Sequence, residues 1–263
     1  MPVYLLGTLD TKGHEIAFVR DLLREYDVTP RIGDTGGRGE PAIQADITRD
    51  EVFQAAGTSL AAVRDKNDRG LAVTAAATGA ANLVAAAYAR SEVEGVLALG
   101  GSAGTTIGTS AMRALPLGVP KLMVSTLASG QTRPYVGGKD IMMLNSVVDI
   151  AGINRISRQI LSEAARAMAG MVTLPSVALQ QQPATLSEGS TLFDCSHDPA
   201  IRSETEHQPT TDKPLIAATM FGVTTPCVEH ARKILEAAGY EVLVFHATGN
   251  GGEAMEGLIA DGL

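Results

Sequence analysis

Four short apolar segments of this chain each run into a corner rich in glycine and hydroxyl side chains, and a segment with helical periodicity follows each one. The corners span residues 7–13, 100–104, 221–226 and 246–252. Alternating strands and helices are typical of a mostly parallel β-sheet with helices on both faces. The carboxyl ends of such strands gather at one edge of the sheet, where open α/β proteins bind ligands. The sequence therefore predicts an α/β fold with a ligand site at that edge.

The composition argues against several classes of protein. Of the 263 residues, 45% are hydrophobic and 19% charged, which provides for a well-buried core and argues against global disorder. A formal net charge of −8 argues against a nucleic-acid-binding protein, because phosphate backbones are bound by basic surfaces. Cys195 and Cys227 do not make a disulfide framework, and the pair Cys195 and His197 lacks a second ligand pair at zinc spacing.

Hydrophobic periodicity and turn residues divide the chain into elements. The expected strands are 2–6, 28–32, 95–99, 121–125, 141–144, 214–220 and 240–246. The expected helices are 14–26, 50–56, 70–90, 105–115, 154–169, 225–238 and 252–260. Thr48 is the expected cap of the second helix. In the helix over 154–169, the side chains expected to face inward are Ile156, Ile160, Leu161 and Ala164.

The periodicity stops over residues 177–213, a polar stretch with several prolines that we interpret as a linker or surface insertion. This stretch separates a first unit, residues 1–176, from a second unit, residues 214–263. The second unit has only two strand–helix pairs, too few for an independent α/β layer. Either it packs onto the first sheet or the chain is a fragment of a longer protein, and we expect the fragment.

Residues 71–89 form an uncharged stretch nearly long enough to span a bilayer. Most of it is alanine, with Thr74, Thr78, Gly79 and Asn82 among the rest, so its transfer into lipid would gain little free energy. The sequence favours a buried, close-packed helix. No basic segment followed by a long apolar run stands at the start of the chain, and we expect a soluble, cytoplasmic protein without membrane contacts.

The corner after residues 97–99 has the clearest link to a ligand. Glycines at 100, 101 and 104 remove the Cβ atoms that would keep an anion from the backbone, and the helix that follows favours negative charge at its start. The corner matches neither GxxxxGK[ST] nor GxGxxG. Its other interpretation is a tight turn in which Gly101 and Gly104 only permit close packing. Several such corners at one edge favour an anionic ligand.

The candidate ligand-binding residues belong to these corners and to one loop after the strand over 121–125. They are Thr8, Asp10, Thr11, Lys12, Gly100, Gly101, Ser102, Ala103, Gly104, Thr105, Ser129, Gly130, Thr248, Gly249, Asn250 and Gly251. Asp10 and Asp149 are the candidate ligands of Mg²⁺. No catalytic residue is assigned.

Each of these residues also has a structural explanation. Lys12 supplies a positive charge for a phosphate or is an ordinary solvated lysine. Asp10 binds Mg²⁺ or caps the helix that begins beside it. Asp149 and Asn154 lie in a long irregular passage, typical of functional loops, or they brace the next helix. His246 ends a strand and is either catalytic or only half-buried.

Five of these segments together resemble a known protein family. They are 7–13, 100–102, 146–152, 220–227 and 245–249. The chain resembles the uncharacterised bacterial, fungal and plant family that includes the ATP-binding inhibitory domain of the tomato mosaic virus resistance protein. The resemblance implies a Rossmann-like unit followed by a second, incomplete one, ATP binding and a homodimer or higher homo-oligomer. It implies no reaction.

Three functions follow as hypotheses. In the first, the chain binds ATP or a similar nucleotide: residues 100–105 hold the phosphates through backbone N–H groups, Lys12 adds charge, and Asp10 or Asp149 holds Mg²⁺. In the second, an ATP-dependent enzyme acts on a small metabolite with Asp140, Asp149 and His246 near the same edge. In the third, the nucleotide stabilises a dimeric protein-interaction module, whose helix over 71–89 has the small side chains that close helix contacts need.

Overall fold

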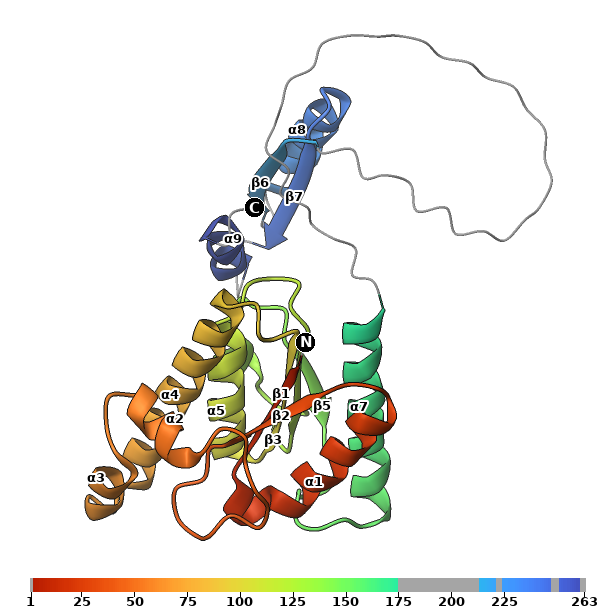
Figure 1. Ribbon diagram of the computed structural model, residues 1–263. Helices are drawn as coiled ribbons and strands as arrows, with labels where there is room; N and C mark the ends of the chain where they lie inside the picture. The colour runs from red at the N-terminus through yellow and green to blue at the C-terminus, as the bar shows by residue number, and fades with distance from the viewer. Residues whose placement is uncertain (1, 175–212, 221–223, 247–250, 261–263) are drawn as a thin grey trace, which may run out of the picture.

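The computed structural model describes residues 2–174, 213–220, 224–246 and 251–260. Within residues 2–174, five parallel strands form one sheet in the order β2-β1-β3-β4-β5 (Figure 1). The strands are β1 (Val3–Gly7), β2 (Pro30–Asp34), β3 (Gly95–Gly100), β4 (Lys121–Ser125) and β5 (Met142–Asn145). The predicted Rossmann-like α/β architecture, mostly parallel with helices on both faces, is confirmed.

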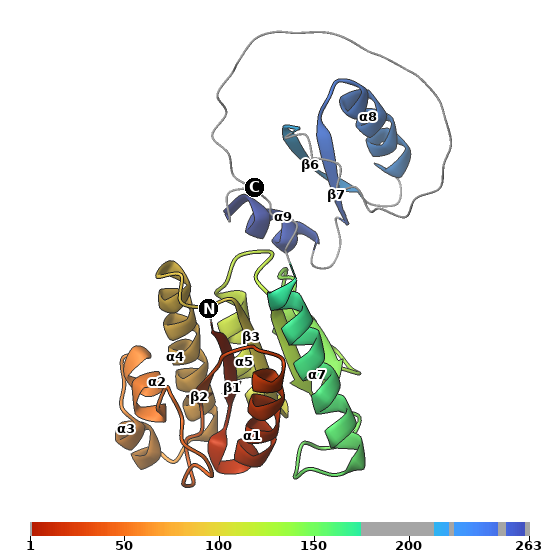
Figure 2. The same cartoon turned by 45° about the vertical axis from the view of Figure 1, so that its right-hand side comes forward.

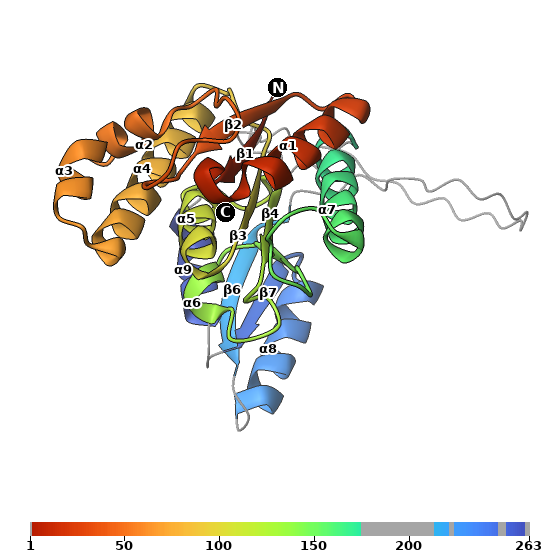
Figure 3. The same cartoon turned by 90° about the horizontal axis from the view of Figure 1, so that it is seen from below.

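Helices cover both faces of this sheet. Their bounds are α1 (Leu9–Glu25), α2 (Arg49–Ala55), α3 (Leu60–Asp65), α4 (Arg69–Ala89), α5 (Ser102–Arg113), α6 (Arg133–Val136) and α7 (Arg155–Thr173). Seen along the strands in Figure 3, α1 and α7 lie on one side of the sheet, and α2 and α4 lie on the other (Figures 2 and 3). Strands β1, β3 and β4 are therefore buried on both faces, as their apolar sequences predict, whereas the edge strand β5 is only partly buried.

Alternate residues of β1 supply the two cores. Val3 and Leu5 pack in the cluster under α1 and α7, whereas Tyr4 and Leu6 pack in the cluster under α2, α4 and α5. This division follows from the strand geometry, because successive side chains point to opposite faces of a sheet. All four side chains are at most 4% exposed, which fixes the register of this interior strand.

Three helix predictions need correction. α1 begins at Leu9 and α5 at Ser102, several residues before the expected starts, so residues expected in loops form first helical turns. The short helices α3 and α6 were not predicted, because neither is long enough to show a period. Ile156 is 44% exposed instead of facing inward, whereas Leu161 and Ala164 are buried as expected.

Helix α4 packs one face against α5 and α2. Its buried residues are Ala76, Ala77, Gly79, Ala80, Val84 and Ala87. By length and composition it is the one described helix that passes for a membrane span, and a third of the relevant window (33%) is buried within this fold. The expectation of a buried helix is thus met on one face, while Leu71 and Tyr88 on other faces are more than a third exposed.

The described residues after 212 form a second, smaller sheet. It consists of the parallel strands β6 (Leu215–Met220) and β7 (Glu241–His246), accompanied by α8 (Thr225–Ala237) and α9 (Gly251–Ala260). Both strand–helix pairs expected here are present. The predicted linker over 177–213, including Cys195 and His197, lies outside the described residues except for its last position.

We expect Gly79→Ala to destabilise the fold. A Cβ atom at Gly79 would lie 1.8 Å from the carbonyl oxygen of Val52 in α2, so α4 and α2 would have to separate. Overpacking of this kind costs about 1–3 kcal/mol or more. Urea unfolding measures the difference.

Gly170→Ala in α7 is the matched control, because nothing lies within 4 Å of the added Cβ. An added alanine in an open helix stabilises it by about 0.5–1 kcal/mol. Equal stability of the two variants would contradict the close approach of α2 and α4.

Candidate functional site

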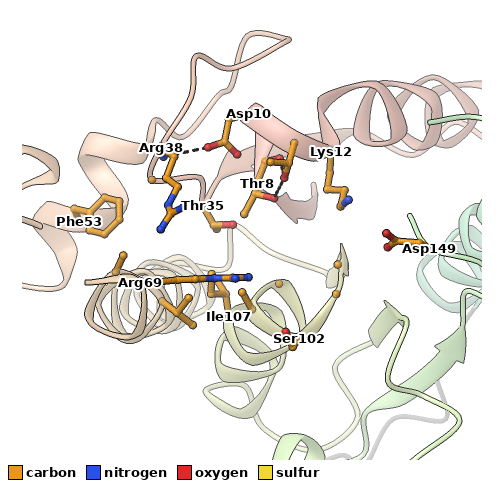
Figure 4. A pocket seen from close by; sticks show the side chains of 18 residues that line it. Thr8, Asp10, Lys12, Thr35, Arg38, Phe53, Arg69, Ser102, Ile107 and Asp149 are labelled. Carbon is orange, nitrogen blue, oxygen red and sulfur yellow. Dashed lines mark hydrogen bonds between the residues drawn. The ribbon is translucent and has the colours of Figure 1, made fainter. Parts of the chain in front are cut away.

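A cavity of about 460 Å³ opens at the carboxyl ends of β1, β2 and β3 (Figure 4). It is lined by Thr8, Asp10, Thr11, Lys12, Thr35, Gly37, Arg38, Phe53, Arg69, Ala72, Val73, Gly100, Gly101, Ser102, Ala103, Gly104, Ile107 and Asp149. The chain leaves β1 toward α1 on one face and leaves β3 toward α5 on the other. The cavity thus occupies the topological switch point, where sheets of this class bind ligands.

The first turn of α5 faces this cavity with unused backbone donors. Gly101 is the N-cap, and the first intrahelical bond runs from the Thr105 N–H to the Gly101 carbonyl, at 2.8 Å. Within the part of the chain that the structure describes, the N–H groups of Ser102, Ala103 and Gly104 have no hydrogen-bond acceptor. Open donors at the positive end of a helix dipole are a binding site for an anion.

The glycines of this corner serve packing as well as access. A Cβ atom at Gly100 would lie 2.6 Å from the Cα of Gly104, and one at Gly104 would lie 3.1 Å from the Leu99 carbonyl oxygen. These two glycines let α5 begin directly against β3. A Cβ atom at Gly101 meets only the Thr126 hydroxyl, at 3.7 Å. The close-packing interpretation therefore applies to Gly100 and Gly104 and not to Gly101.

Thr105 does not line the cavity, contrary to its assignment as a ligand-binding residue. Its side chain is fully buried, and its hydroxyl lies 2.6 Å from that of Ser125 and donates to the Gly101 carbonyl at 2.8 Å. The residue instead fastens the start of α5 to the end of β4. A threonine one turn into a helix points its hydroxyl back along that helix, and here β4 lies beside it.

The first turn of α1 supplies a cation and two hydroxyl groups. Lys12 and Asp149 lie toward one end of the cavity in Figure 4. The ammonium group of Lys12 donates to the carbonyl oxygen of Ile150. The hydroxyl groups of Thr8 and Thr11 are 2.6 Å apart. Lys12 is therefore held at the cavity wall by a neutral acceptor, and no carboxylate among the described residues pairs with its positive charge.

Asp10 organises a neighbouring loop. One of its carboxylate oxygens accepts the backbone N–H groups of Arg38 and Gly39, at 3.1 and 3.0 Å. Holding this loop is neither the helix-capping nor the magnesium-binding role that the sequence left open for Asp10, and it engages one of the two carboxylate oxygens. Asp10 lines the cavity nonetheless.

A buried ion pair between Asp34 and Arg49 also fixes this loop, which connects β2 to α2. Asp34 ends β2, and its carboxylate accepts from the N–H groups of Leu9 and Gly36, at 3.1 and 2.8 Å. Its other oxygen receives the Arg49 guanidinium at 2.7–2.8 Å, and both side chains are less than a tenth exposed. Arg49 also donates to the Gly39 carbonyl. The pair joins the starts of α1 and α2 to the loop between β2 and α2.

The short helix α2 is positioned by its cap. Thr48 and Glu51 form the expected capping box, in which the Thr48 N–H donates to the Glu51 carboxylate at 2.7 Å and holds the pKa of Glu51 below its usual value. The helix places Arg49 under the loop and Phe53 against the cavity. Thr48 is thus confirmed as the cap predicted from the sequence.

The apolar wall of the cavity was not predicted from the sequence. Phe53, Ala72, Val73 and Ile107 give this wall an apolar surface. Thr35, Gly37, Arg38 and Arg69 line the cavity as well. The run Gly33–Gly37 does end a predicted strand, so a search for glycine-rich strand ends could have found this loop. No local pattern assigns Arg69 to the site, because it begins a helix that follows a different loop.

A second, smaller depression borders the cavity at the ends of β4 and β5. Its volume is about 310 Å³, and it is lined by Thr126, Ser129, Asn145, Ser146, Val147, Val148 and Asp149. Ser129 therefore lies beside the main cavity instead of in it, and Gly130 lines neither space. Asp149 lines both.

The loop that carries Asp149 is tied to α1. Lys12 donates to the Ile150 carbonyl, and buried Glu15 accepts the Gly152 N–H at 2.5 Å. Asn154 then caps α7 by accepting from the N–H groups of Ile156 and Ser157, as the structural interpretation of this residue predicts. The carboxylate of Asp149 is exposed and takes no part in these ties.

The other residues that the sequence assigned to the site lie elsewhere in the structure or outside the described residues. Asp140 pairs with the buried ammonium of Lys121 at 2.7 Å. Because Lys121 begins β4, this carboxylate lies at the amino edge of the sheet, and its placement near the ligand edge was wrong. Thr248, Gly249 and Asn250 lie outside the described residues. Gly251 begins α9, and His246 ends β7.

The described residues contain no cluster of three or more histidine, cysteine, aspartate or glutamate side chains that could hold a metal ion. Asp10 and Asp149 lie toward different ends of the cavity in Figure 4. Magnesium bound with phosphates needs only one or two carboxylates, since waters and phosphate oxygens complete its shell. Asp149 therefore fits such a role better than Asp10, whose carboxylate is engaged.

The fold and the cavity define an α/β protein with a cavity at the carboxyl edge of a Rossmann-like sheet. The chain belongs to the uncharacterised protein family UPF0261: residues 1–176 match its N-terminal domain and residues 213–263 its C-terminal domain. The predicted family resemblance is confirmed.

Relatives from bacteria and tomato show the extent of the family. A UPF0261 protein of Clostridium tetani is 45% identical over 99% of this chain and 57% of its own length. The tomato (Solanum lycopersicum) ToMV resistance protein Tm-1(GCR237) is 34% identical over 99% of this chain and 33% of its own length. The chain thus spans little more than half of its bacterial relatives. A solved Listeria monocytogenes protein, described as a UDP-N-acetylglucosamine 2-epimerase, matches with a TM-score of 0.36 and 13% identity, covering 99% of this chain and 65% of its own.

We expect Arg49→Ala to destabilise the fold strongly. It would leave the buried Asp34 carboxylate without its cation, and breaking such a pair costs about 3–5 kcal/mol. Arg90→Ala is the control, because the pair of Arg90 with Glu92 is exposed and its loss should leave the melting temperature unchanged. Equal melting temperatures for the two variants would contradict the anchoring role of the Asp34–Arg49 pair.

Proposed function

We propose that this chain binds ATP or a similar nucleotide in the cavity, with the phosphates at the start of α5. The observation that carries the proposal is the row of open N–H groups at Ser102, Ala103 and Gly104, directed into a cavity of ligand size. Lys12 adds a cation at the same rim. The apolar wall at Phe53, opposite this charged part, suits the flat face of a base.

The same proposal also covers the metal ion, the cellular location and the oligomeric state of the protein. Mg²⁺ would accompany the phosphates, with Asp149 as its protein ligand. We place the protein in the cytoplasm and expect a homodimer or higher homo-oligomer that binds neither nucleic acid nor membrane. Light scattering with and without nucleotide tests the oligomer, and a monomer under both conditions would contradict it.

An enzymatic role is the second candidate, and Asp149 favours it. Its exposed carboxylate borders both the main cavity and the hydroxyl-lined depression beside it. A carboxylate placed between ATP and a hydroxyl-bearing metabolite can accept the hydroxyl proton as the oxygen bonds to the γ-phosphorus and the bond from that phosphorus to the departing ADP breaks. The chain would then be an ATP-dependent enzyme acting on a small polar metabolite.

Ser102→Pro tests the binding proposal by removing one phosphate donor. Proline is tolerated at the first position of a helix and lacks the N–H group. A hydrogen bond to a charged group contributes about 1.5–3 kcal/mol, so calorimetric titration with Mg·ATP should show affinity lowered by about 10-fold to 100-fold. Arg155→Pro, at the first position of α7, is the matched control.

Unchanged affinity in Ser102→Pro, or no binding of Mg·ATP by the wild-type chain at millimolar nucleotide, would overturn the proposal. A loss of affinity in Arg155→Pro as large as in Ser102→Pro would also overturn it, because the effect would then come from proline in the fold.

Asp149→Asn tests the second candidate. We expect this variant to keep its affinity for the nucleotide without Mg²⁺ and to lose ATP turnover on a panel of hydroxyl-bearing metabolites. Full turnover by the variant on a substrate that the wild-type chain accepts would contradict the role of Asp149 as the base.

A further inference from the structure

Two arginines face the cavity without a partner of opposite charge. Arg38 comes from the loop after β2, and Arg69 begins α4. Figure 4 shows the Arg38 guanidinium on the Phe53 side of the cavity and the Arg69 guanidinium over Ile107, with Lys12 and Asp149 further along. Over the described ranges, neither guanidinium has a hydrogen bond or an ion pair. Two like charges in one concavity repel each other unless an anion lies between them.

Arg69 begins its own helix beside an acidic cap. It occupies the first position of a helix of 21 residues, and the N-cap Asp68 accepts the Leu71 N–H at 3.1 Å. The Asp68 carboxylate therefore already places a negative charge at the start of α4. An anion that binds between the arginines would be attracted by their two side chains and not by this helix start.

Arg38 is held in place by its backbone. Its N–H donates to the carboxylate of Asp10 at 3.1 Å, and its carbonyl accepts from the guanidinium of Arg64 at 2.9 Å. Arg64 also donates to the carbonyl of Gly37 at 2.8 Å. The loop backbone is thus fixed, so the binding of an anion has to order only the Arg38 side chain and not the loop.

We propose that Arg38 and Arg69 form a second anion-binding subsite, for a phosphate or carboxylate group other than the phosphates at the start of α5. Guanidinium groups suit both anions, because their paired N–H donors match two oxygens at once. The proposal deepens the proposed nucleotide site, on which it rests for the ligand in the rest of the cavity. The second anion is carried either by the nucleotide itself, as a phosphate on its ribose, or by a separate small acid.

Calorimetric titration of the full chain distinguishes these sources. One arm compares AMP with adenosine 2′,5′-bisphosphate and adenosine 3′,5′-bisphosphate. The other adds malonate to protein saturated with ADP. We expect at least one bisphosphate to bind at least tenfold tighter than AMP, or malonate to bind the ADP complex. The first result assigns the anion to the nucleotide, and the second assigns it to a separate acid.

The double variant Arg38→Gln/Arg69→Gln should abolish this gain and change the affinity for ADP by less than about threefold. Arg155→Gln/Arg166→Gln, on α7 outside the cavity, removes the same charge and should behave as the wild-type chain does. Equal melting temperatures confirm that the double variants are folded.

The subsite is overturned if neither bisphosphates nor malonate show a gain in the wild-type chain, or if the arginine variant loses ADP as strongly as it loses the probes. Failure of the nucleotide proposal looks different. ADP would then not bind the wild-type chain, whereas malonate alone would bind it and would lose that binding in the arginine variant.

Discussion

The carboxylate of Asp34 is the interaction on which the architecture of the site depends. It stands at the end of β2 and is bonded to the N–H groups of Leu9 and Gly36 and to the guanidinium of Arg49. Through these bonds it links the start of α1, the loop after β2 and the start of α2. A buried charge of this kind is tolerated only when its partners are fully in place, so the loops at this edge are held in one arrangement.

The helices α1 and α5 differ in whether the N–H groups of their first turns have acceptors. At α1, Asp34 occupies the N–H of Leu9, and the Thr8 carbonyl accepts the N–H of Thr11. At α5, the described residues offer no acceptor to the corresponding donors, and the cavity lies in front of them. The electrostatic field of α5 is therefore available to a ligand. Close packing of α5 on β3 and the Thr105–Ser125 bond hold these donors in position.

More of the fold than of the site could be predicted from the sequence. Apolar runs and helical periods located the strands and most helices, because strands that are buried on both faces of a parallel sheet have nearly continuous apolar sequences. Lys12 and Ser102 were found because each lies at a glycine-rich strand end, and Asp149 was found because it lies in a long irregular passage. Arg38 and Arg69 were missed, since their place in the cavity depends on tertiary contacts of the loop after β2 and of α4. Thr105 and Asp140 were misplaced because spacing does not reveal that a hydroxyl turns inward or that a carboxylate pairs with Lys121.

The most direct test of the account follows the amide resonances of α5 by nuclear magnetic resonance while Mg·ATP is added to the isotope-labelled chain. The account predicts that the N–H signals of Ser102, Ala103 and Gly104 shift in proportion to occupancy, because these donors become bonded to phosphate oxygens. The N–H signals at the start of α7 should stay in place, since Asn154 already accepts two of them. Nucleotide binding that leaves the three α5 signals unmoved would contradict the account.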